Sequence, residues 1–134
     1  MLDLALEKLQ ACIKKRILHF SPIRESVLKE IVASDKALCS EEIYKRVAEK
    51  SQKKVSFNTV YRVLRLLEAC EIVRIIQSDF KRTHYALATC ECHIYTLHKN
   101  SNDLMPMENS SASQQLLKEH QLENTKSFIV IHKV

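Results

Sequence analysis

Metal-ligating side chains gather at one place in the chain, at Cys90, Glu91, Cys92 and His93. Thiolate, carboxylate and imidazole groups are all competent ligands for Zn²⁺ or Fe²⁺. Because four consecutive residues cannot easily surround one tetrahedral ion, a complete site needs a distant ligand. The candidates for that ligand are His84, His98, Glu108, His120 and His132. Three interpretations stay open: a metal site, a redox-sensing thiol at Cys90 or Cys92, or a structural remnant that binds nothing.

A second set of side chains has the types and spacing for contact with duplex DNA. An apolar stripe at helical spacing, Val60, Val63, Leu64 and Leu67, predicts a docked helix whose other face is polar. Asparagine suits adenine, arginine suits guanine or a phosphate, and threonine or tyrosine suits thymine methyl groups or phosphates. We predict DNA contacts by Ser56, Asn58, Thr59, Tyr61, Arg62, Arg65, Lys53, Lys54, Lys81 and Arg82. The alternative is that Tyr61 and Arg62 merely cover the helix surface.

The positive charge of the chain lies in its first two thirds. Residues 1–88 hold 17 Lys and Arg against 11 Asp and Glu, whereas residues 89–134 hold 4 against 5. This asymmetry suits one lobe that meets a polyanion and a second lobe with another role. A solvated basic surface is the alternative.

The elements that must position these residues follow from the apolar periodicity. Helices are predicted over residues 3–18, from Pro22 after a capping Ser21, from Ser40, and from Phe57 to about Cys70 after a capping Ser56. Two short β-branched segments follow, Ile72–Ile76 and Thr83–Leu87. Helices followed by a two-stranded hairpin with a basic tip are typical of a winged helix-turn-helix.

The remainder predicts a short β-α-β arrangement, with strands at His93–Leu97 and Ser127–His132 and a helix at Ser113–His120. Such a segment is too small to hold a core alone, so we expect its strands to pair across a dimer. The fold class is therefore α+β, with a winged-helix DNA-binding domain at residues 1–88 and a short α/β dimerisation domain at residues 89–134.

Cysteine and glycine usage adds two expectations. Five cysteines are an odd number, and we expect Cys12, Cys39 and Cys70 to be buried as small apolar residues rather than paired in disulfides. Glycine is absent. Hairpins and helix ends commonly use glycine to reach positive φ, so we expect a looser wing tip, or another residue such as Asp79 in that conformation.

The segments at residues 21–24 (Ser-Pro-Ile-Arg), 40–44 (Ser-Glu-Glu-Ile-Tyr) and 58–64 (Asn-Thr-Val-Tyr-Arg-Val-Leu) resemble the ferric uptake regulator (Fur) family. Residues 68–73 and 85–87 are similar to that family's turn into the wing and to its second wing strand. The resemblance implies a homodimeric repressor of A·T-rich operators in which Tyr61 and Arg62 contact DNA. It places His19 where the family has a minor-groove lysine, and it adds Arg24 and Lys15 to the DNA-contacting set.

The family's metal ligands are mostly replaced in this chain. The family's Cys-x-x-Cys positions fall at Thr96 and Lys99, and its regulatory ligands fall in the segment Lys36-Ala37-Leu38, at Ala86 and at Lys126. The resemblance therefore implies reduced or absent metal dependence. No cofactor is certain, and Zn²⁺ or Fe²⁺ at Cys90–His93 stays open.

The sequence thus predicts a cytoplasmic, homodimeric DNA-binding regulator whose partner is an A·T-rich palindromic operator. No membrane segment or signal peptide is evident, and no catalytic constellation is found, so an enzyme is not expected. Two alternatives stay open. One is a winged-helix partner protein that modulates a metal-sensing homologue, and the other is a metal- or redox-responsive regulator that uses Cys90–His93.

Overall fold

The computed structural model describes residues 2–15, 21–77, 82–88, 94–101, 103–107, 111–121 and 129–133. The chain divides into two compact units, Met1–Cys90 and Glu91–Val134. The domain boundary predicted between residues 88 and 89 falls close to this division. Among the described residues, no helix is both long enough and apolar enough to span a membrane.

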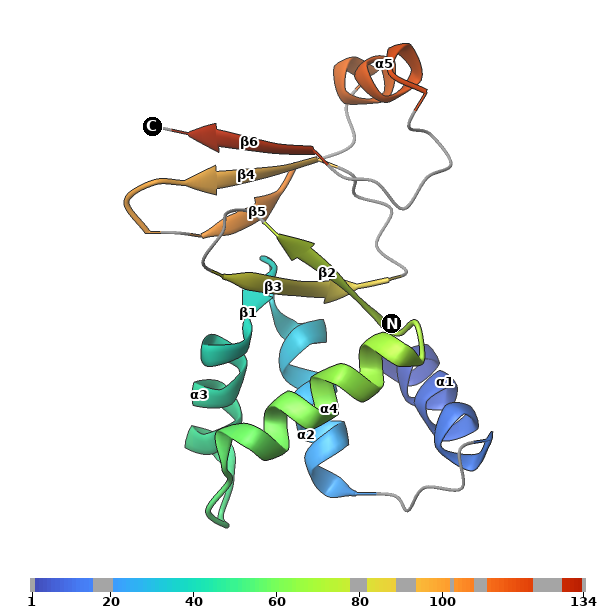
Figure 1. Ribbon diagram of the computed structural model, residues 1–134, viewed down its shortest axis with the longest axis vertical. Helices are drawn as coiled ribbons and strands as arrows, with labels where there is room; N and C mark the ends of the chain where they lie inside the picture. Colours follow the sequence, from blue (N-terminus) through green and yellow to red (C-terminus); the bar gives the residue numbers. More distant parts are fainter. Residues whose placement is uncertain are drawn as a thin grey trace. The chain divides into compact units, whose positions relative to one another are not determined.

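In its described residues, the first unit contains four helices and a small antiparallel sheet (Figure 1). The helices are α1 (Leu2–Lys15), α2 (Pro22–Ala33), α3 (Ser40–Lys50) and α4 (Phe57–Ala69). The strands are β1 (Leu38–Cys39), β2 (Val73–Gln77) and β3 (Thr83–Leu87), arranged in the order β1-β3-β2. The predicted winged helix-turn-helix is therefore present, and β1 adds a third strand that the sequence did not indicate.

The core of this unit lies where α2, α3 and α4 meet. Val60, Leu64 and Leu67 of α4 are fully buried, and Val63 is nearly so. They pack with Leu28 of α2 and with other buried residues of α1, α2, α3 and the sheet. Figure 1 shows α4 crossing α2, with α3 beside them. The predicted apolar stripe of α4 is thereby confirmed as its docked face.

The start of α2 differs from the sequence prediction, whereas α3 begins at Ser40 as predicted. Ser21 stands at the N-cap of α2, but its side chain makes no capping hydrogen bond. Pro22 in the first turn lacks an N–H, so one fewer donor needs a partner there. At α3 the capping residue is Cys39, and its side chain and backbone pair reciprocally with Glu42.

The C-terminal end of α4 is closed without glycine. Glu71 adopts a φ of 57°, the left-handed conformation that glycine usually provides. This turn lets the N–H groups of Glu71 and Ile72 donate to the carbonyl oxygens of Glu68 and Leu67, each at 2.9 Å. β2 begins two residues later, so the turn into the wing is made by a residue other than glycine.

The expectation that Cys12 and Cys70 are unpaired is wrong. They form a disulfide that joins α1 to the residue following α4, with the two Cα atoms 6.0 Å apart. Both cysteines belong to apolar helical stretches that pack into one core, and this packing brings the two thiols together. Beside them, Lys8 Nζ donates to the Glu71 carbonyl oxygen at 2.9 Å. Cys39 is buried and free, as expected.

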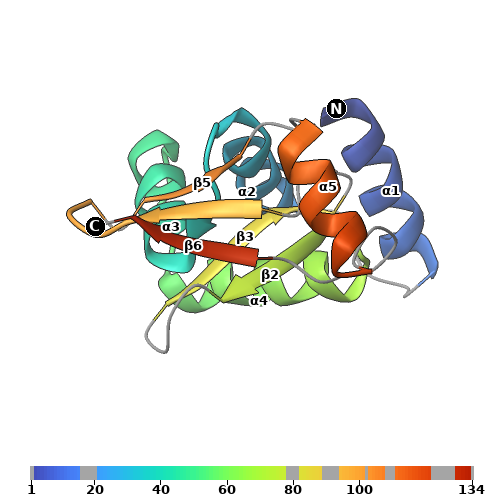
Figure 2. The same cartoon turned by 90° about the horizontal axis from the view of Figure 1, so that it is seen from above.

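The part of the second unit that the structure describes holds one sheet and one helix (Figure 2). Its elements are β4 (Ile94–His98), β5 (Leu104–Pro106), α5 (Ser111–Glu119) and β6 (Ile129–Lys133). β4 lies in the middle, antiparallel to β5 and parallel to β6. The predicted β-α-β order is confirmed, and β5 was not foreseen. These strands pair within the chain and leave β5 and β6 at the edges, so pairing across a dimer stays a prediction.

The disulfide should contribute measurably to stability. We expect Cys12→Ser to lower the free energy of unfolding by about 2–4 kcal/mol, because the crosslink restricts the unfolded chain. The two cysteines are 58 residues apart in sequence, so the closed loop is long. Urea unfolding without reductant measures the difference, and dithiothreitol should bring the wild-type protein to the level of the variant. Identical midpoints without reductant would show that the crosslink contributes nothing.

Candidate nucleic-acid interface

Helix α4 presents a polar face opposite its buried stripe. The side chains of Asn58, Thr59, Tyr61, Arg62 and Arg65 are all exposed. They are the residues that the sequence singled out on this helix, and the docking of α4 makes them available together. Their groups include an amide, a hydroxyl and two guanidinium groups, which can pair with base edges and phosphates.

The first turn of α4 is held by its own side chains. The Thr59 N–H donates to Ser56 Oγ at 3.2 Å, and the two hydroxyl groups lie 2.8 Å apart. This confirms the predicted cap at Ser56. The hydroxyl group of Ser56 is therefore engaged within the helix, although the residue itself remains exposed.

An aromatic row of Tyr44, Phe57 and Tyr61 also braces this turn. The rings of Tyr44 and Phe57 meet edge to face, with centroids 5.7 Å apart, and those of Phe57 and Tyr61 stack at 6.4 Å. Sequence reasoning missed Phe57. The available signal was the spacing of four residues between Phe57 and Tyr61, which places two rings on one side of a helix.

Exposed basic side chains both precede and follow α4 in the sequence. Lys53 and Lys54, in the loop before α4, and Arg82, just before β3, are exposed. A hollow of 360 Å³ is lined by residues of α2 and α4, including Arg24, Thr59 and Arg62. A second hollow of 410 Å³ is lined by Ile23, Lys54, Val55, Ser56 and Thr59. Arg24 is thus brought to the same groove as Arg62, although 38 residues separate them in the sequence.

Several predicted site residues lie outside the described part of the chain. His19 and Lys81 belong to this group, as does the whole tetrad Cys90, Glu91, Cys92 and His93. Asp79, the candidate for positive φ at the wing tip, does too. Lys15 closes α1, but its side chain is not described. In the described ranges, no three His, Cys, Asp or Glu side chains are grouped so that they can hold a metal ion.

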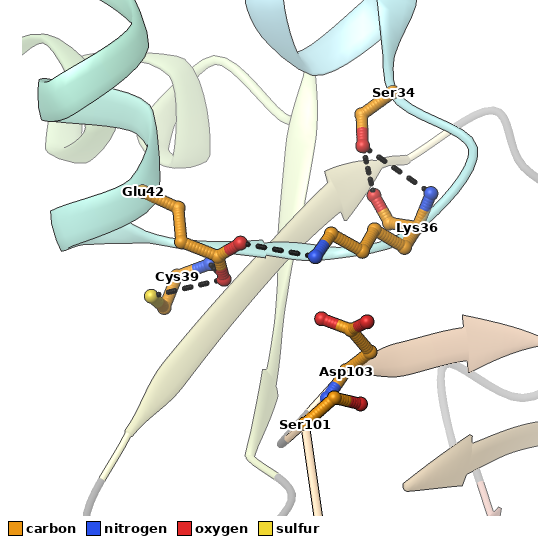
Figure 3. A network of polar contacts seen from close by, with 6 residues as sticks. All are labelled: Ser34, Lys36, Cys39, Glu42, Ser101 and Asp103. Atoms are coloured by element: carbon orange, nitrogen blue, oxygen red, sulfur yellow. Dashed lines mark hydrogen bonds and ion pairs between the residues drawn. The ribbon is translucent and has the colours of Figure 1, made fainter. Parts of the chain in front are cut away.

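The segment before α3, where the resemblance places a metal ligand, is occupied by an ion pair (Figure 3). Lys36 Nζ lies 3.2 Å from Glu42 Oε2. The other oxygen of this carboxylate accepts from the Cys39 N–H at 3.4 Å and from Cys39 Sγ at 3.2 Å. Ser34 holds the backbone of this segment in a turn, since its Oγ donates to the Lys36 carbonyl oxygen at 2.8 Å and accepts from the Lys36 N–H. Figure 3 also draws Ser101 and Asp103 of the second unit, where the Asp103 N–H donates to Ser101 Oγ at 3.4 Å.

Burial and this pairing fix the charge states of the network. Burial, together with smaller contributions from side-chain hydrogen bonds to Glu42 and Glu41, raises the pKa of the Cys39 thiol from 9.0 to about 11. Burial alone would raise the pKa of Glu42, but hydrogen bonds from Cys39 and the ammonium group of Lys36 bring it below 4.5. Cys39 is therefore a neutral thiol at pH 7, and a neutral thiol is a poor metal ligand and a poor nucleophile.

The first unit, with its docked α4, polar outer face and β2–β3 wing, defines a winged-helix DNA-binding protein. The model of the ferric uptake regulator family matches residues 15–132 of the chain. The chain belongs to this family. Its members are DNA-binding transcription regulators, so the chain is a regulator of transcription and not an enzyme.

Individual relatives agree with this assignment. The ferric uptake regulation protein of Campylobacter jejuni is 28% identical over 136 residues, which cover 98% of this chain and 87% of that protein. Its counterpart in Helicobacter pylori is 33% identical over 99 residues, covering 72% of this chain and 65% of that protein.

Solved structures share the fold. The Helicobacter pylori ferric uptake regulator superimposes with a TM-score of 0.78 at 24% identity, covering 98% of this chain and 89% of that chain. The Vibrio cholerae regulator gives 0.70 at 19% identity, covering 92% and 96%. The predicted α+β fold class, a winged helix followed by a small α/β unit, is thereby confirmed.

The network in Figure 3 should make stability depend on acid pH. Because the folded state lowers the pKa of Glu42, its carboxylate stabilises the fold above the ordinary value of 4.5, and this contribution is lost as pH falls through the folded pKa. We expect Glu42→Gln to be less stable than the wild-type protein at about pH 7, with the difference shrinking towards about pH 4. Urea unfolding at both pH values measures this effect.

Glu49→Gln is the matched control, since it removes an exposed carboxylate from the other end of α3. It should leave stability nearly unchanged at both pH values. A loss in Glu42→Gln that is the same at every pH would show that the negative charge of Glu42 does not stabilise the fold.

Proposed function

We propose that this chain is a homodimeric, sequence-specific repressor that inserts α4 into the major groove of an A·T-rich palindromic operator. The observation that carries the proposal is the exposed polar face of α4 above a fully docked apolar stripe. Asn58 is placed to pair with adenine, and Arg62 with guanine or a phosphate. Acting on chromosomal DNA, the protein works in the cytoplasm.

The flanking basic residues position the duplex. Lys53, Lys54 and Arg82 are exposed on either side of α4 in sequence, and each suits a backbone phosphate. Arg24 joins them through the hollow that it lines with Thr59 and Arg62. These contacts carry no sequence information but fix the register of α4 on the DNA.

The second unit provides the dimer in this proposal, with residues 89–134 as the dimerisation domain. β5 and β6 are the edge strands of its sheet, and an edge strand presents unpaired backbone groups that another chain can extend. Two copies related by a two-fold axis would place two α4 helices on two half-sites, which explains the expected palindrome.

Metal dependence is reduced or absent in this proposal. A metal-ligand role does not suit the described residues at the sensor positions, because the ammonium group of Lys36 pairs with Glu42 and the Cys39 thiol is neutral. Ala86 provides no ligand either. The structure of the Helicobacter pylori regulator is described as having three functional metal-binding sites, so this chain would differ from that relative. Zn²⁺ or Fe²⁺ at Cys90–His93 is the alternative.

Removal of one guanidinium group from α4 should weaken DNA binding. We expect Arg62→Ala to raise the Kd by about 5- to 150-fold, because a good side-chain contact to a base contributes about 1–3 kcal/mol. Fluorescence anisotropy at fixed salt measures the Kd, with a duplex that the wild-type protein enriches from a random pool. Lys118→Ala is the control, since it removes an equal charge from an exposed position on α5.

The Lys118→Ala variant should bind within about twofold of the wild-type protein, because α5 belongs to the second unit, to which the proposal assigns no contact with DNA. Equal binding by both variants would sink the assignment of α4 as the reading helix. If Arg62→Ala then still regulated a reporter gene normally, the winged helix would act as a protein-binding partner instead.

A chelator should leave the protein dimeric and able to bind DNA. We expect elemental analysis to find no stoichiometric metal, and the selected duplex to be bound with the same Kd with and without EDTA. Sedimentation velocity after EDTA treatment should still give dimers, because strand pairing and apolar contacts need no ion. Stoichiometric metal together with loss of binding or dissociation on chelation would establish Cys90–His93 as a working site.

A further inference from the structure

Phe57 occupies an unusual position for an apolar ring. It is the first residue of α4 and continues the spacing of the buried stripe, lying three residues before Val60 and seven before Leu64. Val60 and Leu64 are fully buried, yet Phe57 remains 39% exposed. The docking that covers the rest of the stripe therefore leaves this ring partly in water.

The exposed ring is held in place from two sides. Tyr44 of α3 meets it edge to face at 5.7 Å, and Tyr61 stacks against it at 6.4 Å with an angle of 16° between the planes. A ring fixed between two others loses little conformational freedom when it contacts a ligand. The aromatic row is thus a preorganised apolar surface at the N-terminal end of α4.

The neighbours of Phe57 indicate what covers it. Ser56, Asn58, Tyr61 and Arg62 surround it in sequence or in helical turn, and all are exposed. The polar groups of Asn58, Tyr61 and Arg62 suit the base edges of a duplex, and the N-terminal end of a recognition helix is the part that reaches those edges. A hydrocarbon ring pairs with no donor or acceptor there. The one apolar group that the major groove offers is the C5-methyl group of thymine.

We propose that Phe57 is a specificity-determining residue whose ring packs on a thymine C5-methyl group at the N-terminal end of α4. This inference rests on the proposed function and adds to it a residue and a base. Tyr44 acts as a positioning residue behind the ring, and Tyr61 extends the apolar surface beside it. An A·T-rich operator then provides the methyl groups for which this surface is suited.

Removal of single methyl groups from the DNA tests the contact directly. The probe is the duplex enriched by the wild-type protein from a random pool, with each thymine replaced in turn by deoxyuridine, which keeps its base pairing. We expect one thymine per half-site at which the replacement weakens wild-type binding by about fourfold, the effect of losing one buried methyl group. The other thymines serve as internal controls.

Variants of Phe57, measured on the same set of duplexes, complete a double-mutant cycle between the ring and the methyl group. Phe57→Ala should bind the thymine duplex more weakly than the wild-type protein and should be indifferent to loss of that same methyl group. Phe57→Leu keeps apolar volume without the ring, and it should retain part of the methyl sensitivity. Thermal unfolding of both variants confirms that they are folded, and the leucine variant keeps the test informative where the alanine variant is unstable.

The outcomes separate the inference from the function on which it rests. Full methyl sensitivity in Phe57→Ala, even with weaker overall binding, overturns the proposal and reduces Phe57 to a brace for Tyr61. Absence of any sensitive thymine for the wild-type protein overturns it too. If the wild-type protein enriches no duplex from the pool, the proposed function fails first, and that result is visible before any variant is made.

Discussion

Val60, Leu64 and Leu67 of α4 have no exposed surface, and their burial against α2 and α3 is the interaction on which the N-terminal unit depends. Each such side chain contributes about 1.5–3 kcal/mol by leaving water. Because a helix turns by a fixed angle per residue, burying this stripe determines which side chains point outward. Asn58 and Arg62 are therefore exposed as a consequence of how the core packs.

Both ends of α4 are fixed by contacts that the apolar stripe does not supply. At the start, Ser56 caps the helix and the ring of Phe57 is held between two tyrosines. At the C-terminal end, the disulfide of Cys70 joins the helix to α1, and the turn at Glu71 joins it to the wing. The polar face of α4 is consequently carried on a rigid element, as recognition of a fixed duplex geometry requires.

The sequence predicts the helices well because their signals are local and periodic. The stripe of α4 and the cap at Ser56 follow from spacing alone, and the structure confirms both. The pairing of Cys12 with Cys70 could not be derived, since periodicity places each thiol on an apolar face without saying which faces meet. For the same reason β1, only two residues long, gave no pattern, and the partial exposure of Phe57 depends on where its neighbours end.

The absence of glycine from all 134 residues affects the conformational entropy that the backbone loses on folding. Every residue carries a Cβ atom, so the unfolded ensemble samples fewer conformations, and each ordinary residue in place of glycine favours folding by about 0.4–1 kcal/mol where its native backbone allows it. The cost appears at Glu71 and Gln121, where φ is 57° and 55° just beyond α4 and α5. Left-handed geometry costs an ordinary residue about 1–2 kcal/mol. The smaller entropy of the unfolded chain thus favours folding, and the left-handed backbone of Glu71 and Gln121 offsets part of this stabilisation.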